Sequence, residues 1–421
     1  MEEALAGLRY GKTLLDLDLS GFASSPLVLA PARSLSAGDE PKIVRDALAN
    51  PIGSRPLAGL VHAGQRVVIV TSDVTRPCPS ARLLPSVLEE LNRGGVRDED
   101  IVVVFGLGNH RPHTTKEQKQ LAGEAVYGRV RCIDSDPTDV KLVGHTRRGT
   151  PVAIFRPVLD ADVRVCMGAL EYHYFAGYSG GYKAIVPGVC TAETIQHNHR
   201  MMIEPGAAPG RLGGNPVRED IDEAGAMVGV HFVLNVILDS SKHVVSAVAG
   251  HPEVAHRTGC ARLDSFGRVV IERPADLVVV SAGGYPKDIN LYQAQKALDS
   301  ARQVVRPGGV ILLVAECAEG TGNQTFETWM SDPQGPDAII ARIQREFVLG
   351  GHKAAAVAAA MKQAAVYLVS ALPQDRARAM GFSPFTSLDD AVQSALKRVG
   401  PSATVVIMPE GGSVLPCVEE R

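Results

Sequence analysis

The feature that most constrains the fold is a series of short Val-, Ile- and Leu-rich runs separated by helical patterns. These runs occur at residues 66–71, 101–105, 163–167, 232–238, 277–281, 310–314 and 404–408. Several are continuously apolar rather than alternating, as expected of strands that are covered on both faces. Between the runs, helical patterns are found at 83–91, 294–305, 353–365 and 388–399. This alternation predicts an α/β fold, with two α/β domains and largely parallel sheets.

Chain length and the order of the runs indicate the domain organisation. At about 150 residues per domain, 421 residues correspond to two or three domains. We expect the boundary near Arg273-Pro274, just before a new strand. This predicts an N-terminal α/β domain at 1–272, a Rossmann-like C-terminal α/β domain at 276–405, and a tail at 406–421 that packs back on the N-terminal domain.

Composition argues against several classes of protein. The net charge of −3 does not favour a nucleic-acid surface, which usually carries an excess of Lys and Arg. The sequence has no apolar run of about 18 residues, and its acidic start is unlike a secretory signal. The 7 cysteines are scattered without a CxxC pair, which favours reduced thiols. We therefore expect a cytoplasmic protein that binds neither nucleic acid nor membranes.

Two polar segments follow expected strands, where open α/β sheets bind their ligands. Asp73 and Arg76 lie on a proline-stiffened segment, and the Arg76 guanidinium could bind a carboxylate or phosphate through two hydrogen bonds. Alternatively, the segment is an Asx turn with a solvated arginine. His110 follows the run at 101–105 and could act as a general base near neutral pH, or could simply bond the backbone.

The segment around His110 is an incomplete dinucleotide fingerprint. Its Gly-Leu-Gly-Asn-His-Arg sequence has Arg111 at the third glycine position, and a GxG pair alone is weak. Thr114 and Glu117 instead predict a capping box, so the next helix is expected to start later than in that fingerprint.

Residues 171–183 form an aromatic-dense segment in a chain with only 5% aromatic residues. The backbone N–H groups of Ser179, Gly180 and Gly181 could form an anion-binding nest. Lys183 could be a phosphate-binding cation or a covalent anchor, although its neighbours do not match a P-loop. The alternative is a glycine-rich surface loop.

Two further segments carry polar residues on expected helices. His197 and His199 are two residues apart and would point about 200° from one another, so a regular helix cannot present both to one metal. One of them could face a site, or neither could be a ligand. Gln293 and Lys296 share one helical face and could reach one anionic ligand, or they could lie at the surface.

Taken together, these segments resemble the nickel-pincer lactate racemase family over roughly residues 70–300. Order and spacing carry the resemblance, rather than any single motif. The matching motifs are D-x-T-R-P-x-P at 73–79, G-x-H-R at 108–111, His173 with an S-G-G-x-K-x-x-x-P-G core at 179–188, a histidine at 199, and Y-Q-x-x-K at 292–296.

The resemblance implies a two-domain α/β isomerase with its active site in the interdomain cleft. It implies a nickel-pincer nucleotide cofactor, which is pyridinium-3-thioamide-5-thiocarboxylic acid mononucleotide with bound Ni, and cofactor-biosynthesis proteins for maturation. By position, the catalytic residues are His110 and His173, and the metal ligand is His199. The cofactor-binding residues are Lys183, Asp73, Ser179, Gly180, Gly181 and Tyr292, and the substrate-binding residues are Arg76, Gln293 and Lys296.

The implied reaction is racemisation of lactate or a related small 2-hydroxy acid through a 2-oxo acid, by proton-coupled hydride transfer. Two histidine bases would serve the two enantiomers, and both are expected to titrate near neutrality. Arg76 and Lys296 would anchor the substrate carboxylate so that only the α-carbon reorients.

Three other interpretations compete with this one. The first is a racemase or epimerase of a larger 2-hydroxy acid or sugar acid. The second is a nicotinamide-dependent 2-hydroxy acid dehydrogenase, which needs the complete glycine fingerprint that Arg111 interrupts. The third is a non-catalytic nickel-cofactor-binding protein, in which loss of a base histidine is expected, yet both histidines are present.

Overall fold

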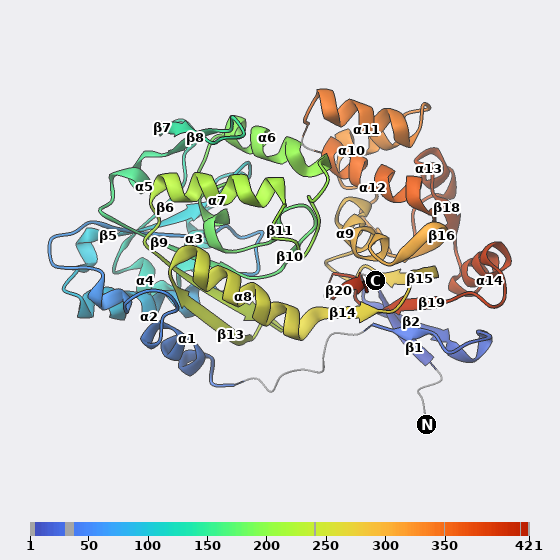
Figure 1. Ribbon diagram of the computed structural model, residues 1–421, viewed down its shortest axis with the longest axis horizontal. Helices are drawn as coiled ribbons and strands as arrows, with labels where there is room; N and C mark the ends of the chain where they lie inside the picture. The colour runs from blue at the N-terminus through green and yellow to red at the C-terminus, as the bar shows by residue number, and fades with distance from the viewer. Residues whose placement is uncertain (1–4, 30–37, 240, 349, 413, 420–421) are drawn as a thin grey trace. The chain divides into compact units, whose positions relative to one another are not determined.

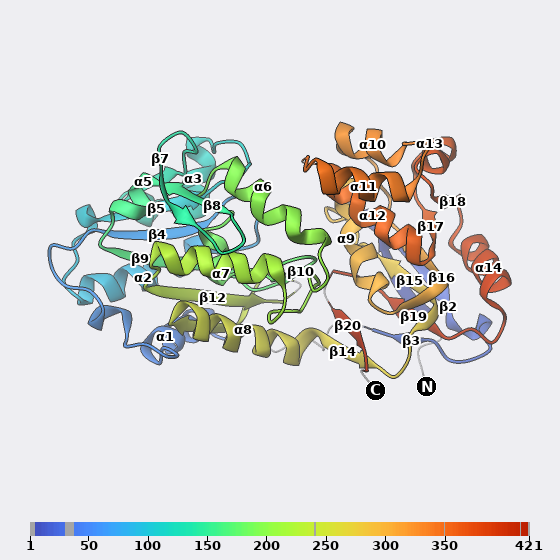
Figure 2. The same cartoon turned by 45° about the horizontal axis from the view of Figure 1, so that its top comes forward.

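The computed structural model describes residues 5–29, 38–239, 241–348, 350–412 and 414–419. The chain divides into two units, each with its own sheet and helices (Figure 1, Figure 2). Unit 2 comprises Ser34–Ser265, and unit 1 comprises Met1–Arg33 together with Phe266–Arg421. Both main sheets are largely parallel, so the predicted fold class is confirmed.

Unit 2 contains a six-stranded sheet of order β13-β12-β9-β4-β5-β6. All neighbouring strands are parallel except β12 and β13. The strands are β4 (Val67–Ser72), β5 (Ile101–Gly106), β6 (Arg131–Asp134), β9 (Val163–Ala169), β12 (Phe232–Leu238) and β13 (Val244–Gly250). Two antiparallel hairpins accompany it, formed by β7 (Val140–His145) with β8 (Pro151–Phe155), and by β10 (Tyr172–His173) with β11 (Gly177–Tyr178).

Helices cover both faces of the unit 2 sheet. They are α1 (Glu40–Ala49), α2 (Ser80–Arg93), α3 (Thr115–Ala122), α4 (Glu124–Tyr127), α5 (Arg156–Asp160), α6 (Ala192–Arg200), α7 (Pro216–Val228) and α8 (Pro252–Gly267), with short 3-10 turns η2 (Leu57–Gly59), η3 (Asp98–Asp100), η4 (Gly181–Ala184) and η5 (Met201–Ile203). On β4, Val67 and Ile69 pack in the core with α1–α4, whereas Val68 and Val70 pack in the core with α5–α7. This two-sided burial explains the continuous apolar run in the sequence.

Unit 1 contains a second six-stranded sheet, of order β18-β17-β16-β15-β19-β3, with all its pairs parallel. The strands are β3 (Leu27–Val28), β15 (Ala275–Ser281), β16 (Val305–Val314), β17 (Ala365–Val369), β18 (Ser383–Phe385) and β19 (Val405–Met408). Smaller pairs are formed by β1 (Leu5–Tyr10) with β2 (Thr13–Asp18), followed by η1 (Leu19–Gly21), and by β14 (Arg268–Ile271) with β20 (Leu415–Val418).

The faces of the unit 1 sheet are covered by different elements. The helices are α9 (Leu291–Arg302), α10 (Gln324–Met330), α11 (Pro336–Arg345), α12 (Gly351–Gln363), α13 (Gln374–Ala379) and α14 (Leu388–Val399). Val278 and Val280 of β15 pack in one core with α9–α13. Leu277 and Val279 pack in the other core with α14 and the β1–β2 hairpin.

The observed domain division differs from the expected one at both ends of the chain. The predicted first domain began at residue 1, but β3 is the edge strand of the unit 1 sheet, next to β19. The tail was expected on the N-terminal domain, yet β20 pairs with β14 inside unit 1. Unit 2 ends at Ser265 and unit 1 resumes at Phe266, whereas the boundary was expected near Arg273. These pairings join segments that are far apart in sequence, so local patterns do not reveal them.

Individual elements follow the sequence patterns more closely. The expected strand at 232–238 is β12, and the expected helix at 388–399 is α14. The predicted capping box is present at the start of α3, where Thr114 and Glu117 bond each other's backbone. The helix expected at 294–305 instead begins at Leu291, because Asn290 caps it, and it ends at Arg302.

Candidate active site

Asp73 and His110 form a hydrogen-bonded pair at the carboxyl ends of the neighbouring strands β4 and β5. The Asp73 side chain is buried, whereas the His110 side chain is 42% exposed. Asp73 Oδ2 lies 2.6 Å from His110 Nδ1, and the Thr75 hydroxyl donates to the same carboxylate at 2.9 Å. Because the carboxylate can only accept, Nδ1 of a neutral His110 ring carries the proton and Nε2 carries the lone pair. This is the arrangement of a general base with an orienting carboxylate.

Asp73 is held in its charged form. Burial by itself would raise the pKa of Asp73, but the hydrogen bond and charge of His110, with smaller contributions from Thr75 and Arg76, lower that pKa below its ordinary value. A carboxylate that stays ionised keeps the His110 tautomer fixed across the neutral range.

His113, which the sequence patterns did not single out, lies in the same loop as His110. Its side chain is 1% exposed. Nδ1 lies 2.7 Å from Asp134 Oδ1 at the end of β6, and Nε2 accepts the Val74 N–H at 3.2 Å. The only sequence signal was a second histidine immediately before the capping box.

His173 stands on the short β10–β11 hairpin, and its ring lies among aromatic rings. It stacks on Tyr174 at a centroid distance of 5.2 Å and makes a T-shaped contact with Phe175 at 4.5 Å. Its Nδ1 accepts the Ala176 N–H at 3.2 Å, so a neutral ring carries its proton on Nε2. His110 and His173 therefore present opposite tautomers.

The expectation that both histidines titrate near neutrality does not hold for His173 in this structure. Burial, reinforced by the positive charges of Lys183 and Arg76, holds the pKa of His173 well below its ordinary value. His199 and Arg218 act on the ring in the same direction. Burial and these neighbouring groups thus disfavour the protonated His173 ring, and an anion bound nearby would offset their positive charges.

The serine and glycines before Lys183 build a tight turn. The Ser179 hydroxyl donates to the Ala169 carbonyl at 2.7 Å and accepts the Glu171 N–H at 2.7 Å. Gly180 and Gly181 have φ values of 73° and 57°, in the left-handed region that favours glycine. The Gly181 N–H donates to Asn235 Oδ1 at 3.0 Å. The Ser179 hydroxyl and the Gly181 amide are therefore engaged within the protein, and a phosphate-binding role for this segment stays a prediction.

Lys183 follows this turn on η4. Its Nζ lies 5.8 Å from the centre of the Phe175 ring. Burial, with repulsion from Arg218 and Arg76, holds the pKa of Lys183 well below its ordinary value. A lysine with a lowered pKa has more of its amine neutral and nucleophilic at neutral pH.

His199 lies near the end of α6, against the edge of Phe175 at a ring-centre distance of 4.9 Å. Its Nδ1 is 3.1 Å from Asn198 Oδ1. The fully buried Asn198 has its amide fixed, since Nδ2 donates to Val217 O and to Asp220 Oδ2. His199 Nδ1 is consequently the donor, and the lone pair of the neutral ring lies on Nε2. Asn198 is a second residue that the patterns missed.

The remaining unit 2 candidate, Arg76, is exposed on the turn after β4 and lines a shallow hollow with the start of α2. Within the described residues its guanidinium has no ion-pair or hydrogen-bond partner in the protein. Its charge nevertheless acts on Asp73, His173 and Lys183. It is placed to receive an external anion.

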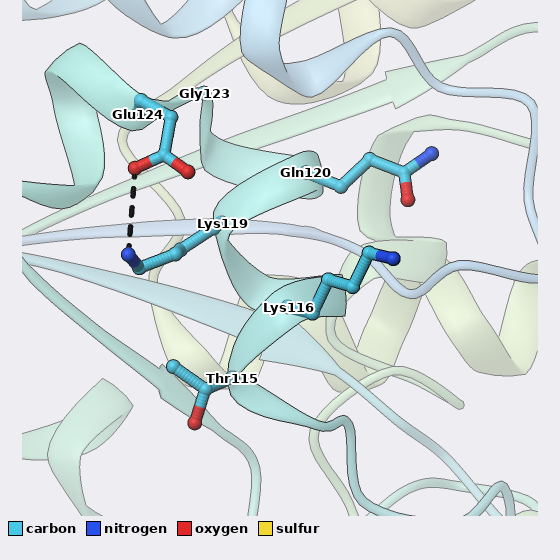
Figure 3. A pocket seen from close by; sticks show the side chains of 6 residues that line it. All are labelled: Thr115, Lys116, Lys119, Gln120, Gly123 and Glu124. Carbon is cyan, nitrogen blue, oxygen red and sulfur yellow. Dashed lines mark ion pairs between the residues drawn. The ribbon is translucent and has the colours of Figure 1, made fainter.

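A second hollow lies on α3 and α4 and contains none of the candidate residues. Figure 3 shows the side chains that line it, with the ion pair between Lys119 and Glu124 at 3.5 Å. Both charged groups are well exposed, so this pair contributes little to stability. Asp73 and His110 lie elsewhere, at the carboxyl ends of β4 and β5.

The incomplete glycine fingerprint has a packing role. A Cβ on Gly106 would come within 3.0 Å of Gly188, and the Gly108 N–H donates to the Gly188 carbonyl at 2.9 Å. These glycines let two chain segments approach closely. They therefore have a function that does not require a dinucleotide.

Three candidates lie on α9 of unit 1. Tyr292 is half-buried, burial raises its pKa, and Lys353 Nζ lies 3.9 Å from its ring centre. Gln293 is half-buried and Lys296 is exposed. Their role beside the unit 2 residues stays a prediction.

Comparison with known proteins identifies the family of this chain. Residues 10–210 match the model of the lactate racemase N-terminal domain, and residues 270–416 match that of the lactate racemase C-terminal domain. The chain is 32% identical over 417 residues to a lactate racemase of Thermoanaerobacterium thermosaccharolyticum, covering 96% of this chain and 97% of the relative. The chain belongs to the lactate racemase family. The predictions of this family and of an isomerase are thus confirmed.

Further matches agree with this membership. A lactate racemase of Lactiplantibacillus plantarum is 31% identical over 389 residues, covering 89% of this chain and 91% of the relative. The structure of the lactate racemase apoprotein from T. thermosaccharolyticum matches with a TM-score of 0.89 at 32% identity, covering 99% of this chain and 100% of that one. A Thermotoga maritima protein shares the fold, with a TM-score of 0.64 at 18% identity, covering 91% of this chain and 100% of that one.

Among the described residues, no three His, Cys, Asp or Glu side chains are grouped so that they could hold a metal ion. No helix in the same part of the chain is long and apolar enough to cross a membrane.

Proposed function

We propose that this protein racemises lactate or a related small 2-hydroxy acid through a 2-oxo acid. The proposal is supported by one observation: unit 2 contains a histidine base oriented by a carboxylate, together with a group of basic side chains. His110 has Asp73 behind it at 2.6 Å, and Arg76 acts electrostatically on Asp73, His173 and Lys183. A carboxylate substrate suits this charge, and the substrate hydroxyl needs a base.

The residues fit a nickel-pincer nucleotide as cofactor. His199 offers one imidazole whose lone pair lies on Nε2, and a pincer ligand would bring the other donors to nickel. Lys183 offers an amine with a lowered pKa that could be linked to, or ion-paired with, the cofactor. When bound, the cofactor would supply the hydride-accepting and hydride-donating chemistry that the protein side chains lack.

The protein residues then have distinct tasks. Arg76 binds the substrate carboxylate, and its two-pronged geometry holds the α-carbon in place. His110 Nε2 accepts the hydroxyl proton while Asp73 stabilises the cationic ring. In the observed tautomer His173 donates a hydrogen bond from Nε2 to the same oxygen, since its Nδ1 accepts the Ala176 N–H. To act as the base for the opposite enantiomer, His173 takes the other tautomer, with its lone pair on Nε2, and gives up the Ala176 bond.

Other expected contacts belong to this proposal. Gln293 and Lys296 would contact the substrate, Tyr292 would border the cofactor, and the turn at 179–181 would border the nucleotide phosphate. A bound anion would raise the pKa of His173 by offsetting Lys183 and Arg76, which would bring that ring closer to the range needed for the reverse direction. Maturation would need cofactor-biosynthesis proteins, and we place the reaction in the cytoplasm.

The test is a chiral assay of cofactor-loaded protein against a panel of 2-hydroxy acids. We expect pure L- or D-lactate, or one related acid, to reach the same equal mixture of enantiomers, and Arg76→Ala to abolish this at low substrate concentration. His243→Ala, a change at an exposed histidine of unit 2, is the matched control and should keep full activity. Conversion of the acid to a 2-oxo acid with stoichiometric reduction of a nicotinamide would instead support a dehydrogenase.

A further inference from the structure

One buried imidazole connects the ends of three neighbouring strands in unit 2. β4, β5 and β6 are adjacent in the sheet. His113, in the loop after β5, bonds Asp134 at the end of β6 and the Val74 amide in the turn after β4. The His113 backbone N–H also donates to Asp134 Oδ2 at 2.7 Å. His113 is thus held on the β6 side by one bond from its ring and one from its backbone to the same carboxylate, and its ring holds the β4 turn through a single bond.

The hydrogen bonds fix the tautomer of His113. The Val74 N–H is a donor, so His113 Nε2 has to accept and cannot carry a proton. The remaining proton of the neutral ring is on Nδ1, where it is donated to Asp134 at 2.7 Å. Asp134 therefore selects the only neutral tautomer that can bond Val74.

The turn that His113 holds carries two residues of the candidate site. Val74 directly follows Asp73, which orients His110, and it lies two residues before Arg76. The His113 side chain is 1% exposed, and its ring makes a T-shaped contact with Phe105 at a ring-centre distance of 5.7 Å. It is thus shielded from substrate, and its direct link to the segment that carries Asp73 and Arg76 is the backbone amide of Val74.

We propose that His113, held in its Nδ1–H tautomer by Asp134, is a positioning residue that sets the placement of Asp73 and Arg76 through the Val74 amide. The catalytic consequence rests on the function proposed above. The backbone link itself does not depend on which reaction the protein catalyses. A shift of the turn by about 1 Å would separate Asp73 from His110, and misplacements of that size can reduce rates by about 10²-fold.

Two substitutions separate the two bonds of this ring. In His113→Asn, the side-chain amide nitrogen takes the place of Nδ1 and can still donate to Asp134, but nothing accepts the Val74 N–H. In His113→Gln, the side-chain oxygen takes the place of Nε2 and can still accept the Val74 N–H. We expect kcat to fall about 10- to 100-fold in His113→Asn and to stay within about threefold of wild type in His113→Gln.

A spectroscopic readout on the protein without cofactor makes the test independent of activity. In protein labelled with ¹⁵N-histidine, His113 should show a protonated Nδ1 and an unprotonated Nε2. The resonance of the His110 Nδ1 proton bonded to Asp73 should persist in His113→Gln and shift or broaden in His113→Asn. His243→Asn, which changes an exposed histidine paired with Asp239, is the matched control and should leave that resonance unchanged.

The outcomes are distinguishable. A protonated Nε2 on His113 would overturn the proposal, as would equal loss of kcat and of the His110 signal in both His113 variants, because the ring would then act only as a packing group. If wild-type protein racemises no 2-hydroxy acid, the proposed function fails, while the His113 tautomer and the His110 signal still decide this inference.

Discussion

At the scale of single residues, the two candidate catalytic histidines differ in what faces their Nδ1 atoms. A carboxylate faces Nδ1 of His110, and a backbone N–H faces Nδ1 of His173. The first contact leaves a lone pair on Nε2, and the second leaves a proton there. One ring is therefore ready to accept a proton while the other is ready to donate a hydrogen bond, as one direction of a racemisation requires.

Asp73→Asn tests the role of the carboxylate. An asparagine amide can donate to His110 Nδ1, which would move the ring proton to Nε2 and remove the base. We expect kcat to fall about 10²–10⁴-fold with a much smaller change in KM. Steady-state racemisation rates measure this effect, and Asp160→Asn, an exposed change in unit 2, should leave them unaltered. An unchanged kcat in Asp73→Asn would mean that the carboxylate does not set the His110 tautomer.

Lys183→Met should stabilise the protein without cofactor. The pKa of Lys183 is lowered in the folded state, so the unfolded chain binds this proton more strongly. The resulting penalty to folding is fully present below the folded pKa and disappears as pH rises through the unfolded value of about 10.4. We expect Tm to rise by about 2–4 °C for each kcal/mol relieved at pH 7, and the gain to vanish near pH 11.

Thermal unfolding at several pH values measures this gain. Lys141→Met, at an exposed position on β7, provides the control and should give no pH-dependent gain. A lower Tm for Lys183→Met at pH 7 would show that the amine is stabilised by its surroundings rather than strained by them.

At the scale of elements, α6 presents its two histidines differently. His199 contacts the Phe175 ring and has its tautomer set by Asn198, and its charge acts on His173. Residues two apart on a helix point about 200° from one another, so His197 lies on a different face. We expect His199→Ala to lose nickel from cofactor-loaded protein and His197→Ala to retain it, as measured by nickel per chain. Similar loss in both variants would remove the assignment of His199.

The elements also show which features of the candidate site sequence patterns can predict and which they cannot. The positions of Asp73 and His110 after strands, and of Lys183 after a glycine turn, could be predicted from the sequence, whereas their roles stay predictions. His113 and Asn198 could not, since their roles depend on partners such as Asp134 and Asp220 that are distant in sequence. The engagement of the Gly181 amide by Asn235 is equally non-local.

At the scale of the whole molecule, the N-terminal segment belongs with the C-terminal half of the chain. The sequence predicted two α/β domains, but the predicted first domain, 1–272, included residues 5–29, which belong to unit 1. Pairing of β3 with β19 spans most of the chain, and Leu8 and Leu17 of the first hairpin lie in a unit 1 core. No local pattern encodes such a partner.

Deletion of residues 1–29 should therefore destabilise unit 1. The only tryptophan of the chain, Trp329, lies in the unit 1 core, so its fluorescence reports on that unit. We expect a lower unfolding midpoint by Trp329 fluorescence, with unchanged hydrogen-exchange protection of the β4 and β5 amides in unit 2. Loss of protection confined to unit 2 would contradict the observed division.

The most direct test of the proposed mechanism is a single-turnover measurement on His110→Ala and His173→Ala loaded with cofactor. Each variant is mixed with one pure lactate enantiomer, or with the acid that the panel identifies, and the 2-oxo acid formed per chain is measured after quenching. We predict that both variants lose racemisation, and that they retain oxidation of opposite enantiomers. The same enantiomer preference in both variants, or wild-type racemisation in either, would contradict the two-histidine account.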